Sequence, residues 1–129
     1  MESITQRYLD CVEGKGYFEG LTFLDVTSKK PKCHRLGRVP YAQPITNSRR
    51  WKRAQQLPAS ITYGSEEKPT NFAEPSAVCP QAIYDLNRNL DPAQMSEDCL
   101  QCNIWIPIGK KPECGWPVWV YLRMSIISQ

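Results

Sequence analysis

The sequence predicts a mostly β, coil-rich chain, and two observations support this fold class. Eleven prolines are spread from Pro31 to Pro117 of the 129 residues, and an internal proline removes a helix donor and clashes with the preceding turn. The apolar segments are short and rich in β-branched and aromatic residues, which is the composition of strands. The length suits about one domain. We therefore expect short strands joined by irregular connections.

The first half of the chain offers one apolar stretch and then basic and proline-rich segments. Residues 17 to 26 carry aromatic and β-branched side chains around Gly20, which predicts two short strands that meet in a turn. A basic loop is expected next, over residues 29 to 38. Residues 38 to 44, RVPYAQP, predict an extended segment, because Pro40 and Pro44 push the residues before them out of the helical region. A turn is expected at residues 46 to 48.

The second half contains the two most apolar stretches. Residues 64 to 80 hold three prolines with little periodicity and predict an irregular excursion over the surface. About one turn of helix is expected near residues 81 to 87. Residues 99 to 106 are mostly apolar after Gln101, as in a strand covered on both faces. Residues 116 to 122, WPVWVYL, give the strongest strand prediction in the chain.

Charge and hydropathy argue against two classes of partner. The formal net charge is +3, from 16 basic and 13 acidic residues, with the excess at residues 29 to 38 and 49 to 53. These are only short mixed clusters that match no known nucleic-acid-binding motif, so we expect solvated surfaces and no nucleic-acid partner. No run of about 18 apolar residues could span a membrane, and we expect no membrane partner. The N-terminus has no apolar signal core, which predicts a cytoplasmic protein; a wrongly assigned start would instead allow secretion.

Six cysteines raise the question of a metal or redox site. Cys99 and Cys102 have the gap of a zinc ribbon, and Cys79, Cys114 or His34 could add ligands. The two intervening residues do not favour the tight turn that zinc requires, and in a strand positions three apart face opposite sides. A redox pair would begin a helix rather than enter a strand. We expect no metal and no cofactor, while a small non-catalytic cysteine-rich interaction or zinc-binding module remains the alternative interpretation.

No catalytic residue can be assigned from the sequence. His34 is the only histidine, so a Ser-His-Asp site would depend on it. It falls in the expected basic loop, without a neighbouring acid to orient its ring, and we expect a surface histidine. Gly-x-Ser-x-Gly, the motif that exposes a serine nucleophile, does not occur.

Five short motifs follow one another in a fixed order. They are RVPYAQP at 38 to 44, Arg50-Trp51, CPQ at 79 to 81, SEDCLQCNIWIP at 96 to 107, and PVWVYL at 117 to 122. In this order they resemble the N-terminal part of the type-B carboxylesterase family, whose motifs are G-I-P-Y-A-x-P, an Arg-aromatic pair, C-x-Q, S-E-D-C-L followed by N-[IV]-x-x-P, and P-V-x-V-x-[IL]. The chain departs from these motifs where Arg38-Val39 replaces Gly-Ile and where Gln101 replaces an aromatic residue.

The resemblance implies a partial α/β-hydrolase fold that holds only the N-terminal strands. Residues 1 to 11 would be an extension, 12 to 122 the N-terminal part of the domain, and 123 to 129 an unrelated tail. It also implies a disulfide between Cys79 and Cys99 and an ion pair between Arg50 and Glu97, in which the planar guanidinium suits a buried fork. The substrate of the full-length parent would be a small-molecule carboxylic ester.

The chemistry of this family is expected to be missing from the chain. The last strand should lead into a His-Gly-Gly-Gly-like loop that forms the oxyanion hole, but Arg123-Met124-Ser125 follows instead. The nucleophile, the acid and the base would lie further along. We therefore expect an inactive, truncated carboxylesterase, produced by an error in gene prediction or splicing after Leu122. The last two apolar strands should flank a later strand, so we also expect poor solubility.

Overall fold

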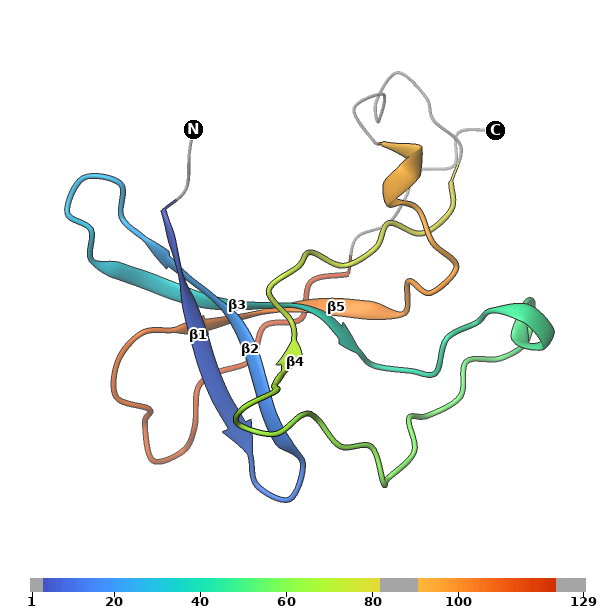
Figure 1. Ribbon diagram of the computed structural model, residues 1–129, viewed down its shortest axis with the longest axis horizontal. Helices are drawn as coiled ribbons and strands as arrows, with labels where there is room; N and C mark the ends of the chain where they lie inside the picture. The colour runs from blue at the N-terminus through green and yellow to red at the C-terminus, as the bar shows by residue number, and fades with distance from the viewer. Residues whose placement is uncertain (1–3, 82–90, 123–129) are drawn as a thin grey trace.

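The computed structural model describes residues 4 to 81 and 91 to 122, and their strands form one sheet. Figure 1 shows β1 (Thr5–Val12), β2 (Gly16–Leu24), β3 (Pro31–Pro40) and β5 (Gln101–Pro107), which pair as antiparallel neighbours in that spatial order. The two-residue β4 (Thr70–Asn71) pairs in parallel with β2. Two 3₁₀ turns, η1 (Asn47–Arg49) and η3 (Pro92–Gln94), complete the elements, and the described residues hold no α-helix. The mostly β, coil-rich fold is confirmed and agrees with a partial α/β-hydrolase fold.

The first hairpin joins β1 to β2 through three residues. Gly14 has a positive φ of 69°, which glycine adopts at little cost, and Lys15 donates its amide to the Val12 carbonyl at 2.9 Å. The pairing runs from Thr5 opposite Phe23 to Val12 opposite Gly16. β1 therefore runs across the expected boundary between an N-terminal extension, residues 1 to 11, and the domain that begins at residue 12. This division into extension and domain stays a prediction.

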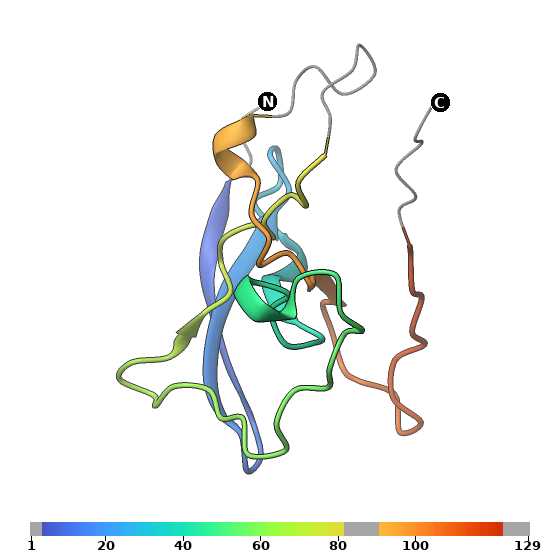
Figure 2. The same ribbon diagram turned by 90° about the vertical axis from the view of Figure 1, so that its right-hand side faces the viewer.

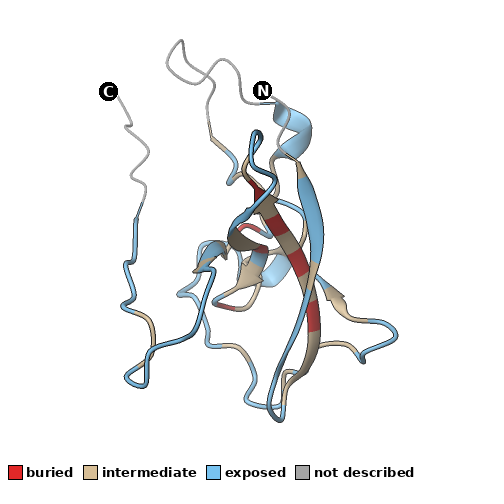
Figure 3. Cartoon of the chain, turned by 90° about the vertical axis from the view of Figure 1, so that its left-hand side faces the viewer, coloured by how far each residue is buried: buried red, intermediate tan, exposed pale blue. Residues whose placement is uncertain are grey.

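A single strand, β2, replaces the two short strands and the turn expected around Gly20, so that prediction is wrong. Glycine serves a different purpose here, because a Cβ on Gly20 would lie 2.5 Å from the Arg35 carbonyl oxygen. The missing side chain lets β3 pass close to β2. Phe18, Thr22 and Leu24 are buried on the same side of β2 as Gly20, and Figure 3 shows this alternation of burial along the strand.

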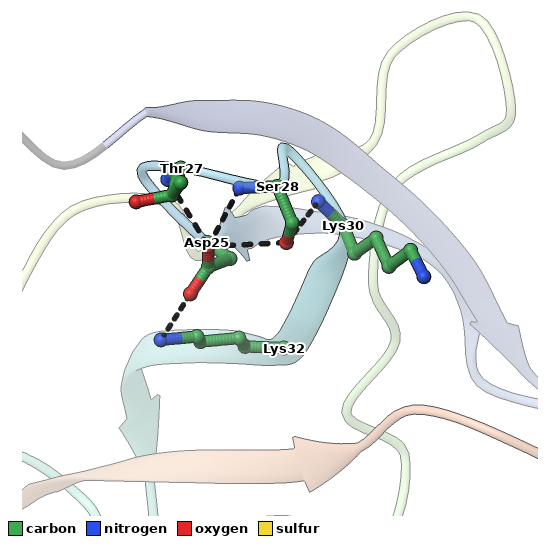
Figure 4. A network of polar contacts seen from close by, with 5 residues as sticks. All are labelled: Asp25, Thr27, Ser28, Lys30 and Lys32. Carbon is green, nitrogen blue, oxygen red and sulfur yellow. Dashed lines mark hydrogen bonds and ion pairs between the residues drawn. The ribbon is translucent and has the colours of Figure 1, made fainter.

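The turn between β2 and β3 is organised by the carboxylate of Asp25 (Figure 4). Its Oδ1 accepts the amides of Thr27 and Ser28 at 3.0 and 2.8 Å and the Ser28 hydroxyl at 3.0 Å. Its Oδ2 pairs with Lys32 Nζ at 2.8 Å. This ion pair, followed by the Ser28 bonds, holds the pKa of Asp25 below its usual range. This short polar turn leads directly into β3 at Pro31.

The basic residues that follow form a strand, so the prediction of a loop over residues 29 to 38 is wrong beyond residue 30. β3 begins at Pro31 and pairs with β2 on one side and β5 on the other. Leu36 is buried. Basic residues are compatible with this strand because they have partners there: Lys32 pairs with Asp25, and Arg35 donates to the Ala73 carbonyl at 2.6 Å.

The small core lies on one face of the sheet and contains Phe18, Leu36 and Phe72. Phe72 is 5% exposed, and its ring centroid lies 6.0 Å from that of Phe18 and 5.6 Å from that of Tyr63. Its amide donates to the Glu19 carbonyl and its carbonyl accepts from Gly37, each at 2.7 Å. Residues 64 to 80 are largely irregular as predicted, but they do not only cover the surface, because Phe72 anchors them in the core.

The strongest strand prediction, residues 116 to 122, is wrong in the structure. This segment is extended but is assigned to no strand, and Figure 2 shows it running apart from the sheet. A β-strand is held by hydrogen bonds to a neighbour, and no described strand pairs with this segment. The total accessible surface of 10681 Å² is large for a chain of 14.8 kDa, since a compact protein of that mass exposes about 7,000 Å². The helical turn expected near 81 to 87 lies almost entirely outside the described residues.

Candidate functional site

The candidate site is a joint where three distant segments meet at the start of β5. Backbone hydrogen bonds fasten two of them, because Val78 donates to Gln94 at 3.0 Å and Ser96 donates to Val78 at 2.9 Å. Just before this contact, η3 is capped by Asp91, whose carboxylate accepts the amide of Ala93 at 2.9 Å. Residues 78 to 80 are thus held beside the stretch that leads to Cys99.

The third segment brings Arg50 to Glu97. The turn η1 ends at Arg50, whose amide donates to Asn47 at 3.2 Å. The Arg50 Nε lies 2.6 Å from Glu97 Oε1, so the structure brings the two expected partners together. The side chains are 54% and 38% exposed rather than buried as expected. A pair this exposed contributes about 0 to 1 kcal/mol, so it acts more in positioning than in stability.

Cys79 and Cys99 lie beside this ion pair as free thiols. Cys79 Sγ contacts the Cys99 carbonyl oxygen at 3.9 Å, which places the two residues together. Cys99 is only 7% exposed, and burial, with a further contribution from the Cys79 thiol, raises the pKa of Cys99 to about 12. The Cys99 thiol is therefore protonated at neutral pH. Their disulfide stays a prediction.

Cys102 does not share a ligand geometry with Cys99. β5 begins at Gln101, so Cys99 precedes the strand that was expected to contain it. The Cys102 thiol donates instead to the Val39 carbonyl at 3.5 Å, across to β3. Burial raises the pKa of Cys102 as well. Among residues 4 to 81 and 91 to 122, no three histidine, cysteine or acidic side chains are grouped in a way that could hold a metal ion.

An open, largely apolar cleft of about 290 Å³ lies over the joint. Its walls come from all three segments and consist of Ile45, Arg50, Trp51, Cys79, Pro80, Glu97, Cys99 and Leu100. Trp51 stands at its edge with a positive φ of 60° and is 96% exposed. The cleft offers one guanidinium, one carboxylate and two thiols. The guanidinium of Arg50 and the carboxylate of Glu97 already pair with each other.

His34 lies in β3 and has a defined environment, which corrects the expectation of a surface histidine in a loop. Its Nδ1 lies 2.8 Å from Thr22 Oγ1, and its ring stacks on Tyr8 with centroids 3.9 Å apart. Burial lowers the pKa of His34, while the charge of Asp10 opposes the shift. The lowered pKa favours the neutral imidazole, and the ring links β3 to Tyr8 of β1 and Thr22 of β2.

Comparison with known proteins identifies the wider family. The model of the carboxylesterase family matches residues 14 to 124, which include the whole joint. This chain belongs to the carboxylesterase family. A carboxylic ester hydrolase of Gibberella moniliformis is 38% identical over 113 residues, which cover 88% of this chain and 20% of that protein. An uncharacterized esterase/lipase of Schizosaccharomyces pombe is 35% identical over 115 residues, covering 87% of this chain and 20% of that protein.

The match extends to more distant members of the family. The cholinesterase of Mus musculus is 32% identical over 89 residues, which cover 64% of this chain and 14% of that protein. This carboxylesterase-family chain thus spans about a fifth of the length of the first relatives named above. No solved structure matches it significantly. No helix in the described part of the chain is long and apolar enough to cross a membrane.

One feature of the joint is not marked by any of the five sequence motifs. The contact of Val78 with Gln94 and Ser96 uses only backbone atoms, so no side-chain pattern announces it. Tyr41 also lies beside the joint, where its amide donates to Leu100 at 3.2 Å. Burial, with the nearby Cys79, Cys99 and Cys102 contributing, raises the pKa of the Tyr41 phenol. Tyr41 falls within the motif RVPYAQP at 38 to 44, so the sequence did mark this position.

Proposed function

We propose that this chain is the N-terminal scaffold segment of a carboxylic ester hydrolase, and that its 129 residues do not hydrolyse esters by themselves. The observation that carries the proposal is the family match over residues 14 to 124, a range that includes the joint of Arg50, Glu97, Cys79 and Cys99. The names of the two relatives with 20% coverage, a carboxylic ester hydrolase and an esterase/lipase, support the substrate class.

The scaffold role follows from what the joint connects. It fastens the segment after β3, through Arg50, and the segment after β4, through Val78, to the residues that lead into β5. β5 itself pairs with β3. Catalytic groups must be held within a fraction of an ångström by such supporting contacts. In the longer protein this joint would fix the strands that carry the active-site loops.

The lack of activity follows from the chemistry of ester hydrolysis. The reaction needs an activated serine, a histidine base and donors for the oxyanion. The chain has no Gly-x-Ser-x-Gly, and Arg123-Met124-Ser125 follows Leu122. The single histidine is engaged with Thr22 and stacked on Tyr8. In the described part of the chain, His34 is thus committed to contacts within the sheet.

Hydrolysis of a chromogenic short-chain ester tests the second part of the proposal. The 129-residue chain should match a buffer blank, and a His34→Gln variant should give the same rate as the unmodified chain. A fluorophosphonate probe, which reacts with activated serines, should leave the chain unlabelled. Ester turnover above the blank that the probe abolishes would contradict the proposed inactivity.

Transcript sequencing across the codon of Leu122 tests the first part. We expect a longer message in which a glycine-rich loop and later a Gly-x-Ser-x-Gly motif follow Leu122. Purified protein from that message should hydrolyse the same ester. If every message continued into the codons of residues 123 to 129 and then stopped, the chain would have no longer hydrolase to scaffold.

A further inference from the structure

Two aromatic rings meet across β2, although their strands are not neighbours. β1 and β3 each pair with β2, so they lie about 9.5 Å apart at the usual spacing of strands. The rings of Tyr8 on β1 and His34 on β3 nevertheless stack, with centroids 3.9 Å apart and planes inclined by 15°. Gly20 lies opposite Tyr8 and has no side chain, which leaves room over β2 for this contact. The stack therefore ties β1 directly to β3.

Hydrogen bonds hold both rings in place. His34 lies opposite Thr22, and its Nδ1 is 2.8 Å from the oxygen of the buried Thr22 hydroxyl. The Tyr8 hydroxyl donates to Asp10 Oδ2 at 2.5 Å, and Asp10 Oδ1 accepts the Cys11 amide at 2.8 Å. Burial, followed by the Asp10 bond, raises the pKa of Tyr8, so the phenol remains a donor near neutral pH. Tyr8 also packs against the core.

The surroundings of the imidazole offer a positive charge little compensation. The side chains near it on the four strands are Tyr8 and Asp10 on β1, Thr22 on β2, Lys32 on β3 and Ile106 on β5. Lys32 is positive and already pairs with Asp25 at 2.8 Å. Asp10 is negative, but it acts on His34 through its charge alone, because both of its oxygens are bonded. Burial outweighs that charge and lowers the pKa of His34 from its ordinary value of 6.5.

We propose that this stack is a pH-sensitive latch, which holds β1 on the sheet while His34 is neutral and loosens when the imidazole takes up a proton. The neutral ring lies against Tyr8 and bonds Thr22 at a small cost in lost hydration. An imidazolium in the same place pays a larger cost, because a partly buried charge loses water. All the side chains of the latch belong to the described strands, so the latch is complete within this chain.

The direction of the pH dependence follows from linkage. A base whose pKa is lower in the folded state than in the unfolded state binds fewer protons when folded. Its stabilising contribution is therefore fully present above the unfolded value of 6.5 and is lost as the pH falls through the lowered pKa of His34. The latch should be closed in neutral solution and should loosen in mildly acidic solution.

An NMR titration between about pH 8 and pH 5 follows the imidazole itself. His34 is the only histidine of the chain, so its ring signals are unambiguous. Its midpoint should lie below 6.5, and the ring signals of Tyr8 should shift with the same midpoint. Asp10→Asn keeps an acceptor for the Tyr8 hydroxyl but removes the opposing charge, so it should move the midpoint further down. A midpoint at or above 6.5, or Tyr8 signals that do not follow His34, would overturn the proposal.

Hydrogen exchange read by mass spectrometry tests whether the strand responds. After correction for the intrinsic pH dependence of exchange, protection of β1 should fall severalfold between about pH 7.5 and pH 5.5. A peptide containing Ser96, whose amide bonds to Val78 in the joint, should keep its protection and serves as the internal reference. Unchanged protection of β1 over this range would show that protonation does not loosen the strand, and the latch would be refuted.

Two variants separate titration of His34 from general weakening of β1. His34→Gln can still bond Thr22 but does not titrate, so it should remove the pH dependence of β1 protection. Glu19→Gln, the matched control, removes the ion pair with Arg7 at 2.6 Å, which joins the same two strands. This control should loosen β1 equally at both pH values. A His34→Gln chain with the pH dependence of the unmodified chain would assign the effect to another group and overturn the proposal.

Discussion

Cys99 should be the slowest cysteine of the described chain to react with iodoacetamide. Its pKa is raised from 9.0 to about 12, first by burial and second by the Cys79 thiol. At pH 8 about one Cys99 in ten thousand would be a thiolate, compared with about one in ten for a thiol at the reference value. Because the thiolate is the nucleophile, alkylation should be slower by about a thousandfold. The rate should rise about tenfold for each pH unit.

Peptide mass spectrometry after timed alkylation at pH 8 measures the rate of each cysteine in one sample. Cys114, which is exposed, serves as the internal reference. Because burial is the larger cause of the shift, Cys79→Ser should leave Cys99 slow. If Cys99 reacted within a few-fold of Cys114 in a folded sample, the buried environment of the joint would be refuted.

Three further outcomes are expected. Oxidation with glutathione disulfide should join Cys79 to Cys99, which are 20 residues apart, and stabilise the chain by about 3 kcal/mol; peptide mapping that pairs Cys79 elsewhere would contradict this. Phe72→Ala should lower the free energy of unfolding by about 3 to 5 kcal/mol in urea titrations, and Phe72→Leu by much less, because Phe72 fills the core. The depressed pKa of Asp25 makes its carboxylate stabilising above about pH 4, and this contribution is lost as pH falls through the lowered pKa. Asp25→Asn should therefore flatten the acid side of the stability profile, whereas an unchanged profile would refute the role of the turn.

Much of the joint could be predicted from sequence, because its residues carry recognisable motifs in order. Arg50 and Glu97 meet as the resemblance implied. The strand errors have a common physical origin in tertiary context. Gly20 is a point of close backbone approach rather than a turn, and residues 116 to 122 have strand composition without a strand partner. The sequence around Phe72 has no periodicity that predicts burial. Phe72 reaches the core because its backbone bonds to Glu19 of β2 and Gly37 of β3.

The backbone bonds from Val78 to Gln94 and Ser96 make the joint insensitive to the length of chain between them. They hold residue 78 beside residues 94 and 96, which are the two ends of the stretch between them. Doubling the length of a flexible loop costs only about 0.6 kcal/mol in closure entropy. A reporter peptide placed between residues 82 and 90 should therefore leave the contact of Arg50 with Glu97 intact. The same property would let related sequences differ in length between residues 78 and 94 while the strands around β5 keep their register.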